Sequence, residues 1–295
     1  MADTQDQEQK VKAYRGNCHC GAFIFEFSMR EITKASTCNC SICSKKGYVW
    51  LFPGETFKVV KDEGTLVEYK FNAGNTVHKF CGTCGTAIMG FNATYPAGNQ
   101  TAINARAVQG LDIWKLETNT FDGGKLEPQY QAPVYTGPEP ATTALDGGKT
   151  YHGSCHCGAV KAAIKVSHAL DSGEYKGRIA ECNCSLCMRG GYVWIYPKKD
   201  EIAIEGAENL TKYAAVNKSW AKAFCKACGV HVLNDLNPLT DEEVAALPEG
   251  ARKQRLGFGE YRPFNLRILN DFDLGCVKPE HLDGWNAVKP MYTNP

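Results

Sequence analysis

The sequence contains the stretch Asn17-Cys18-His19-Cys20-Gly21-Ala22 and repeats it as Ser154-Cys155-His156-Cys157-Gly158-Ala159, shifted by 137 residues. It also contains Cys38-Asn39-Cys40-Ser41-Ile42-Cys43, which returns as Cys182-Asn183-Cys184-Ser185-Leu186-Cys187, shifted by 144 residues. An internal repeat of this length decides the architecture, because each copy folds as a similar unit. The chain is therefore predicted to hold two copies of one domain.

The repeat continues to the end of each copy. Phe80-Cys81-Gly82-Thr83-Cys84-Gly85 matches Phe224-Cys225-Lys226-Ala227-Cys228-Gly229, and Asp122-Gly123 matches Asp283-Gly284 with a shift of 161 residues. The growing shift indicates two insertions in the second copy. We predict domains at 14–124 and 150–286, joined by a Pro- and Gly-rich linker at 125–149. This composition leaves open whether the domains reorient or the linker packs.

Length and composition agree with a folded protein of two domains. The chain has 295 residues, of which 43% are hydrophobic and 22% charged. The N-terminal ten residues lack the apolar core of a secretory signal, and the longest apolar stretch, residues 48–52, is too short to span a bilayer. We expect no membrane association and a cytoplasmic location, with the nucleus as an alternative.

Fifteen cysteines in such a chain indicate metal binding or redox chemistry, because thiols stay reduced in the cytosol. If fourteen of them bind four Zn²⁺ ions as thiolates, the formal charge changes from +1 to −5. Nothing in this charge suggests nucleic acid as a partner. The oligomeric state and the role of the fifteenth cysteine, Cys276, do not follow from the sequence.

Short alternating or apolar runs between turn residues predict a mainly β fold. The expected strands of the first copy are residues 22–27, 48–52, 65–71 and 86–91. In the second copy, the insertion at 235–260 contains Thr240-Asp241-Glu242-Glu243, which has the form of a capping box and predicts a short helix.

Each copy offers a Cys-x-Cys pair, a Cys-x-Cys-x-x-Cys triplet and a Cys-x-x-Cys pair followed by Gly, which suits a turn that needs positive φ. Close pairs on tight turns supply zinc with two of its four ligands at a time. Recurrence of all seven cysteines favours metal binding over disulfides or buried free thiols. Spacing alone allows either two metal ions per copy or one ion with three spare thiols.

These motifs, together with Asn104-Ala105-Arg106 and Asn265-Leu266-Arg267, resemble the glutathione-dependent formaldehyde-activating enzyme and centromere protein V family in both halves. The resemblance implies two tandem zinc-binding β-tent domains and four zinc ions, two of them structural and two at open sites. It implies the structural ligands Cys18, Cys20, Cys81 and Cys84, and Cys155, Cys157, Cys225 and Cys228. It implies open, catalytic sites at Cys38, Cys40 and Cys43, and at Cys182, Cys184 and Cys187.

Three protein ligands with an exchangeable fourth position are typical of a catalytic zinc. The resemblance therefore predicts an enzyme, a carbon-sulfur lyase acting on a thiol adduct of a small aldehyde, such as that of glutathione with formaldehyde. Two alternatives remain, a non-catalytic interaction module and a thiol redox sensor that releases zinc on oxidation.

The chain departs from the family directly after the triplets, where Ser44 and Met188 replace a basic residue. Arginine and lysine side chains nearby are candidates for binding the carboxylates of glutathione, although a solvated or structural pair is the commoner role of a strand arginine. These candidates are Lys45, Arg106, Arg189 and Arg267.

The remaining candidates have mainly structural interpretations. Alternation places Tyr48, Trp50 and Phe52 on one strand face, and Tyr192, Trp194 and Tyr196 likewise, which predicts core packing and, secondarily, a pocket wall. His19 and His156 lie between ligands and are expected to support them or to be exposed. His78 and His231 have no equivalents in the other copy. The 235–260 insertion is either surface decoration or a lid over the second open site.

Overall fold

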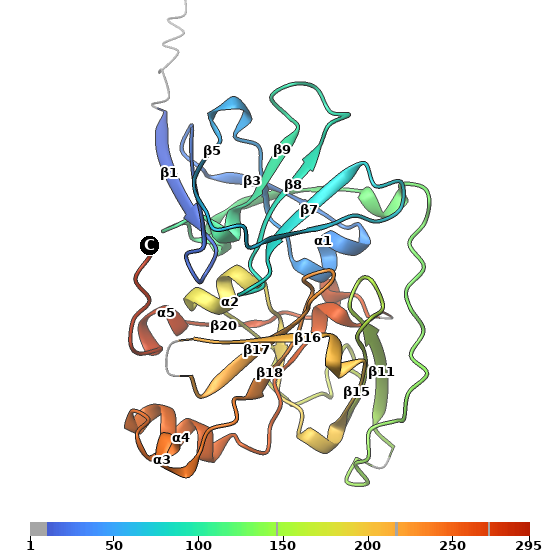
Figure 1. The fold of residues 1–295 in the computed structure, drawn as a ribbon. Coiled ribbons are helices and arrows are strands. Elements are labelled where there is room, and N and C mark those ends of the chain that lie inside the picture. Colours follow the sequence, from blue (N-terminus) through green and yellow to red (C-terminus); the bar gives the residue numbers. More distant parts are fainter. Residues whose placement is uncertain (1–10, 146, 216–217, 271) are drawn as a thin grey trace, which may run out of the picture.

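The computed structural model describes residues 11–145, 147–215, 218–270 and 272–295. It is mainly β, as predicted, and its two halves repeat one arrangement of sheets. Helices α1 (Ser41–Lys46) and α2 (Ser185–Gly190) lie in the layer between the halves (Figure 1). Each of these helices begins within a cysteine triplet, so the triplets lie close to the contact between the halves.

In each half, a three-stranded antiparallel sheet accompanies a seven-stranded mixed sheet. The small sheets have the orders β1-β2-β5 and β11-β12-β15, and the large sheets have the equivalent orders β6-β7-β8-β9-β4-β3-β10 and β16-β17-β18-β19-β14-β13-β20. The strands of the first half are β1 (Lys12–Asn17), β2 (Phe23–Met29), β3 (Lys34–Cys38), β4 (Trp50–Leu51), β5 (Lys58–Asp62), β6 (Leu66–Tyr69), β7 (Thr76–Cys81), β8 (Ala87–Asn92), β9 (Thr101–Asn104) and β10 (Glu117–Phe121). Those of the second half are β11 (Lys149–Ser154), β12 (Lys161–Val166), β13 (Ala180–Cys182), β14 (Trp194–Ile195), β15 (Ile202–Glu205), β16 (Leu210–Ala214), β17 (Trp220–Cys225), β18 (His231–Leu236), β19 (Phe264–Asn265) and β20 (Glu280–Leu282).

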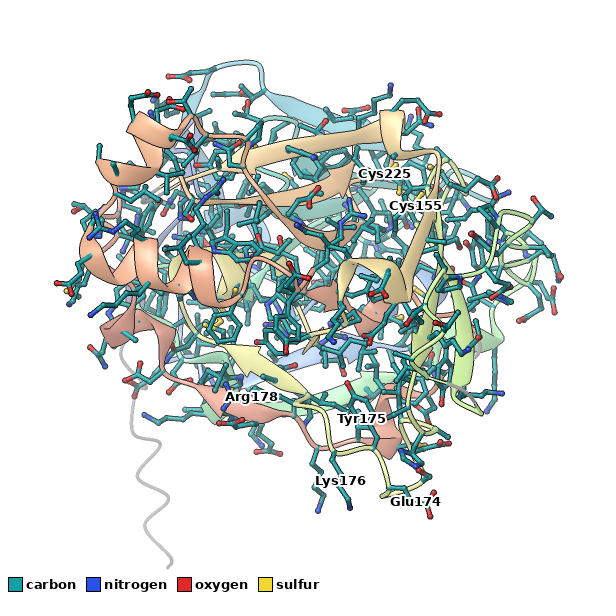
Figure 2. All side chains as sticks on the ribbon, turned by 90° about the horizontal axis from the view of Figure 1, so that it is seen from below. Cys155, Glu174, Tyr175, Lys176, Arg178 and Cys225 are labelled. Carbon is teal, nitrogen blue, oxygen red and sulfur yellow. The ribbon has the colours of Figure 1, made fainter. Side chains whose placement is uncertain are left out.

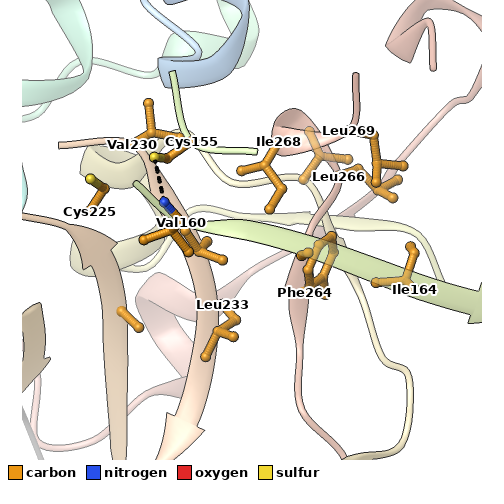
Figure 3. Packing of buried hydrophobic residues seen from close by; sticks show 14 of the residues in the cluster. Cys155, Val160, Ile164, Cys225, Val230, Leu233, Phe264, Leu266, Ile268 and Leu269 are labelled. Atoms are coloured by element: carbon orange, nitrogen blue, oxygen red, sulfur yellow. Dashed lines mark hydrogen bonds between the residues drawn. The ribbon is translucent and has the colours of Figure 1, made fainter. Parts of the chain in front are cut away.

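Each half has a core into which the cysteine turns are built. In β2, Phe23, Phe25 and Phe27 are buried, and Glu26 between them is exposed. In the second half, Figure 3 shows Val160, Ile164, Leu233 and Phe264 packed together, with Cys155 and Cys225 at the border of the same cluster. Because well-packed interiors resist deformation, the cysteine turns are held on a stiff support.

The predicted strands occur, with one exception. Residues 22–27, 65–71 and 86–91 correspond to β2, β6 and β8. The predicted strand at 48–52 is reduced to β4, Trp50–Leu51, because the chain turns at Pro53 into a 3-10 helix at Gly54–Thr56. The placement of Phe52 in the core was therefore wrong, since its side chain is 45% exposed.

The two insertions of the second half lie at its surface. The smaller one falls in the loop before β13, where Figure 2 shows Glu174 and Lys176 projecting from the rim. The larger one holds the predicted helix α3 (Asp241–Ala245), capped by Thr240 and Glu243, and a further helix, α4 (Glu249–Gly257), which the sequence pattern did not predict. Figure 1 shows both helices at the far end of the second half from α2, so this insertion does not cover the second triplet.

The linker packs against the second half, and the chain end packs against the first. Tyr130 stacks on His156 with ring centroids 4.3 Å apart, and its hydroxyl donates to the His156 carbonyl over 2.7 Å. Tyr292 makes the equivalent contacts with His19, at 4.3 Å and 2.8 Å. Of the two possibilities that the linker composition left open, the structure shows the packed one. No described helix combines the length and apolar character needed to cross a membrane.

Candidate metal centres

The first two cysteine clusters contain four residues each. Their sulfur atoms lie within 4.8 Å of one another, in the groups Cys18, Cys20, Cys81 and Cys84, and Cys155, Cys157, Cys225 and Cys228. The closest Sγ–Sγ distances are 3.5 to 3.6 Å. A tetrahedral zinc with Zn–S bonds of about 2.3 Å separates its sulfur atoms by about 3.8 Å, so both groups fit such an ion.

Tight turns present these thiols. Gly85 and Gly229, which follow the Cys-x-x-Cys pairs, have φ of +74° and +68°, as the sequence predicted from their position. The amide of Phe23 donates to Sγ of Cys18 over 3.3 Å, and the amide of Val160 donates to Sγ of Cys155 over 3.2 Å (Figure 3). Amide donors of this kind stabilise thiolate over thiol, which is the form that binds metal.

The other two clusters are the triplets Cys38, Cys40 and Cys43, and Cys182, Cys184 and Cys187, each again with sulfur atoms within 4.8 Å. In both, the first cysteine ends a strand, the second caps a short helix and the third lies inside that helix. One helical turn therefore gathers three thiols on one side. Among the described residues, no fourth His, Cys, Asp or Glu joins either group.

The first triplet is supported by residues outside its own turn. Trp50 donates its indole N–H to Sγ of Cys43 over 3.3 Å. Asn39, between the first two cysteines, donates to Asp122 over 2.7 Å and accepts from the Gly124 amide over 2.7 Å. A Cβ atom on Gly123 would lie only 2.5 Å from Sγ of Cys38, so only glycine leaves room for this thiolate.

The second triplet has the same support. Trp194 donates to Cys187 over 3.4 Å, Asn183 donates to Asp283 over 3.2 Å, and a Cβ on Gly284 would lie 2.3 Å from Sγ of Cys182. In the sequence, the Asp-Gly pairs indicate only the ends of the domains. Their recurrence in both copies was the signal that could have assigned them to the sites.

The thiols of the triplets differ in acidity in the absence of metal. Hydrogen bonds from Cys40 and Cys43 lower the pKa of Cys38 to about 3, against the effect of burial. In the second triplet, hydrogen bonds from Cys182 and Cys184 hold the pKa of Cys187 well below its ordinary value, and Lys222 and Trp194 contribute. Each triplet therefore stabilises at least one thiolate before an ion binds.

A cavity of about 690 Å³ opens on the first triplet. Its wall includes Cys38, Cys43 and Tyr48 of the first half and Tyr130 of the linker. The second half contributes Leu266, Arg267, Leu269, Asn270, Phe272, Asp273, Leu274 and Gly275. The predicted pocket-wall role of Tyr48 agrees with this, although Tyr48 also stacks on Trp50 with centroids 4.0 Å apart. The space beside the first triplet is thus formed by both halves together.

The two halves interlock through their cysteine turns. Nε2 of His19 lies 3.0 Å from Oγ of Ser185, and Nδ1 lies 3.0 Å from the hydroxyl of Tyr213. His156 makes the equivalent contacts with Ser41, at 2.9 Å, and Tyr69, at 2.7 Å. Both histidines are buried, so the exposed role allowed for them is wrong and the supporting role holds.

Two of the candidate carboxylate-binding side chains serve this interface instead. Lys45 donates to the carbonyls of Ser154 and Ile268 and to the amide oxygen of Asn270. Arg189 donates to the backbone and side-chain oxygens of Asn17. Both reach from a triplet helix into the other half, next to its four-cysteine cluster, so they are not available to clamp a substrate.

Lys46 is buried with no hydrogen-bond partner for Nζ among the described residues. Nζ lies 4.3 Å from the centre of the Phe80 ring, and a Cβ on Gly229 would approach it to 2.7 Å. Burial lowers the pKa of Lys46 to about 8, while the thiols of Cys228, Cys225 and Cys43 raise it. A zinc ion held by four thiolates would give this cluster two negative charges, which would balance a buried ammonium group at this position.

The first half differs from the second in the surroundings of its tyrosine. The hydroxyl of Tyr48 and Nδ1 of His78 are buried without described partners. In the second half, the equivalent hydroxyl of Tyr192 lies 2.7 Å from Nδ1 of His231, whose Nε2 lies 3.0 Å from the Gly85 carbonyl. The two triplets therefore share their cysteines but not their polar surroundings.

The clusters of four and three cysteines on a repeated β domain define a protein whose sites could hold metal ions. A family model of the glutathione-dependent formaldehyde-activating enzyme matches residues 13–122 and again residues 150–263, and the chain belongs to this family as a tandem of two such domains. A crystal structure of a Rhodobacter sphaeroides protein is 24% identical over 44% of this chain and 98% of that protein, with a TM-score of 0.32.

Proposed function

We propose that this protein is a zinc-dependent carbon-sulfur lyase acting on the adduct of a glutathione-like thiol with a small aldehyde. The observation that carries the proposal is the position of Cys38 and Cys43 in the wall of a cavity, in a cluster with no fourth described protein ligand. A zinc ion held there would supply a Lewis acid with an exchangeable position for the sulfur of a thiol.

The fit to zinc rests on the donors. Three thiolates from one helical turn match its preference for sulfur, and a fourth, non-protein ligand completes a tetrahedron. The indole of Trp50 orients Cys43. Because Gly123 has no side chain, the sulfur of Cys38 has room beside it. Supporting contacts of this kind orient ligands and tune the site. The four-cysteine clusters would hold structural zinc, which gives four ions per chain.

The reaction cleaves the C–S bond of a hemithioacetal, the S-hydroxyalkyl adduct of the thiol. The bonding electrons stay on sulfur, the hydroxyl proton leaves the oxygen as the C=O bond forms, and the free thiol and aldehyde are released. The reverse reaction forms the adduct. Since all fifteen cysteines are free in the structure, we expect the protein to work in a reducing compartment such as the cytoplasm.

Exchange of formaldehyde between solution and its glutathione adduct, followed by NMR, tests the proposal. The zinc-loaded protein is expected to accelerate the exchange, and Cys40→Ser to reduce the acceleration at the first site. Cys276→Ser is the matched control, because Cys276 is exposed and belongs to none of the four clusters. A fully metal-loaded protein that leaves the exchange rate unchanged would contradict lyase activity and favour an interaction module.

A further inference from the structure

Two arginines, one from each half, lie beside the same pair of glycines at the centre of the interface. Gly47 and Gly191 end α1 and α2 in left-handed conformation, with φ of +60° and +62°. Nε of Arg106 donates to the Gly47 carbonyl and Nε of Arg267 to the Gly191 carbonyl, over 2.7 and 2.5 Å. Each arginine also lies against the glycine of the other half. A Cβ on Gly47 would lie 2.7 Å from Nε of Arg267, and one on Gly191 would lie 3.2 Å from Nε of Arg106.

The charges of this pair are incompletely balanced by the protein. Glu181 lies 3.5 Å from Arg267 and also accepts from the Trp114 indole over 3.0 Å. Arg106 is 8% exposed, and of its side-chain nitrogens only Nε has a hydrogen-bond partner among the described residues, so both outer nitrogens are without one. Burial and the charge of Arg106 lower the pKa of Arg267 to about 10, while Glu181 opposes the shift. In the part of the chain that the structure describes, Glu181 is the one acidic group that raises the pKa of both arginines, so one carboxylate balances two buried cations. Such an excess of buried positive charge is costly, so this position favours an anion.

Both arginines line the cavity that exposes Cys38 and Cys43. The lining also contains Lys45, whose Nζ is held by Ser154, Ile268 and Asn270, and one described carboxylate, Asp273, which accepts from the Gly275 amide over 2.9 Å. A cavity of about 690 Å³ is within the usual size of small-ligand sites, about 300 to 1,000 Å³. One ligand can therefore reach the thiol cluster and the arginines together.

We infer that Arg106 and Arg267 form a carboxylate-binding subsite that belongs to the first open cluster and is completed by the second half. Its ligand class is a thiol that carries a carboxylate several bonds from its sulfur, such as a short peptide thiol. The planar guanidinium suits this role, because it binds a carboxylate through two parallel N–H bonds. The inference rests on the proposed function, since it specifies what the thiol substrate carries.

Through this subsite, the second half contributes a substrate-binding residue to the first site. Arg267 is 223 residues from Ser44, whose carbonyl it contacts over 3.3 Å, so only the docked halves bring it to the cavity. A free single copy of the domain would hold the three cysteines but lack one of the two cations. Substrate selection at the first cluster thus depends on the tandem arrangement.

The test uses cobalt-loaded full-length protein with Cys184→Ser, which restricts an open site to the first cluster. Glutathione, glutathione diethyl ester and 2-mercaptoethanol are titrated against the thiolate-to-cobalt absorption. We expect glutathione to bind about 10- to 100-fold more tightly than its ester, as charge-assisted hydrogen bonds provide. Arg267→Gln is expected to remove most of this preference and to leave the affinity for 2-mercaptoethanol unchanged. Arg30→Gln, which removes an equal charge at an exposed turn, should change neither.

The outcomes distinguish a failure of the subsite from a failure of the proposed function. Equal affinity for glutathione and its ester, or a preference that survives in Arg267→Gln, would overturn the subsite and leave the proposed function standing. No response to any of the three thiols would overturn both. Arg106→Lys is included because Arg106 also holds the Gly47 carbonyl, and metal content and melting temperature identify variants that fail to fold. The comparison of glutathione with its ester in the parent protein needs no arginine variant.

Discussion

Nε2 of His19 lies 3.0 Å from Oγ of Ser185, and this contact joins a four-cysteine cluster of one half to the triplet helix of the other. His19 stands between Cys18 and Cys20, and Ser185 follows Cys184. The contact between His156 and Ser41 repeats the arrangement in the opposite direction. Metal binding in one half is therefore expected to depend on the other half.

Replacing Ser185 by alanine tests this dependence. The change leaves Nε2 of His19 buried without its partner, which costs about 1 to 3 kcal/mol. Faster hydrogen exchange is expected at residues 17–23 of the first half, although the altered residue belongs to the second, and mass spectrometry can measure it. Ser172→Ala, at an exposed serine, is the control and should change nothing there. Exchange that accelerates only around α2 would contradict coupling between the halves.

The two classes of cluster are expected to respond differently to loss of one thiolate. Metal analysis of the purified protein should find four zinc ions per chain. Cys84→Ser or Cys228→Ser should lower the melting temperature strongly, because a structural site contributes its binding energy to folding. Cys40→Ser or Cys184→Ser should leave a folded protein with about one zinc fewer. Equal destabilisation by all four changes would show that the triplets are structural as well.

Gly123→Ala and Gly284→Ala should remove the metal ion from the triplets although no cysteine is replaced. The added methyl group would lie 2.5 Å from Sγ of Cys38 or 2.3 Å from Sγ of Cys182, so the thiolate must move. We expect about one zinc ion fewer for each change. Gly250→Ala is the control, because its Cβ meets nothing within 4 Å in helix α4, where alanine stabilises by about 0.5 to 1 kcal/mol. An unchanged zinc content in both variants would show that the site adapts.

Buried histidines make stability dependent on pH. Burial lowers the pKa values of His19, His78 and His231 to about 3 and that of His156 to about 4. Between the ordinary value of 6.5 and these values, the unfolded chain binds more protons than the folded one. The stability that these neutral rings contribute is present above pH 6.5 and is lost as the pH falls toward 3 to 4.

His231→Gln isolates one of these groups outside the thiol clusters. Nε2 of His231 carries the hydrogen, because its partner, the Gly85 carbonyl, only accepts, and Nδ1 then accepts from Tyr192. Glutamine can still donate but does not titrate. The melting temperature of the variant should fall less steeply between pH 6.5 and 4.5 than that of the parent protein, and both curves should run parallel above pH 7.5. Identical slopes at acid pH would mean that protonation of the thiolates dominates there.

Much of the fold could be predicted from the sequence, because the informative features were local. The recurrence of seven cysteines indicated two equivalent domains, and the glycines after the Cys-x-x-Cys pairs have the positive φ that the turns require. The strand that ended early at Leu51 and the unpredicted helix α4 are both cases where a short pattern did not decide an element boundary.

By itself, the sequence determined which cysteines occur in pairs and triplets, since ligands on one tight turn stay close whatever the rest of the chain does. Only the tertiary structure decided which residues contact those turns. It turned Lys45 and Arg189 into interface contacts, placed Gly123 and Gly284 against the triplets, and brought Arg267 beside Arg106. The physical reason is that these contacts depend on how folded elements pack within a half and how the two halves dock, and residues so far apart in the chain carry no local pattern that records their meeting.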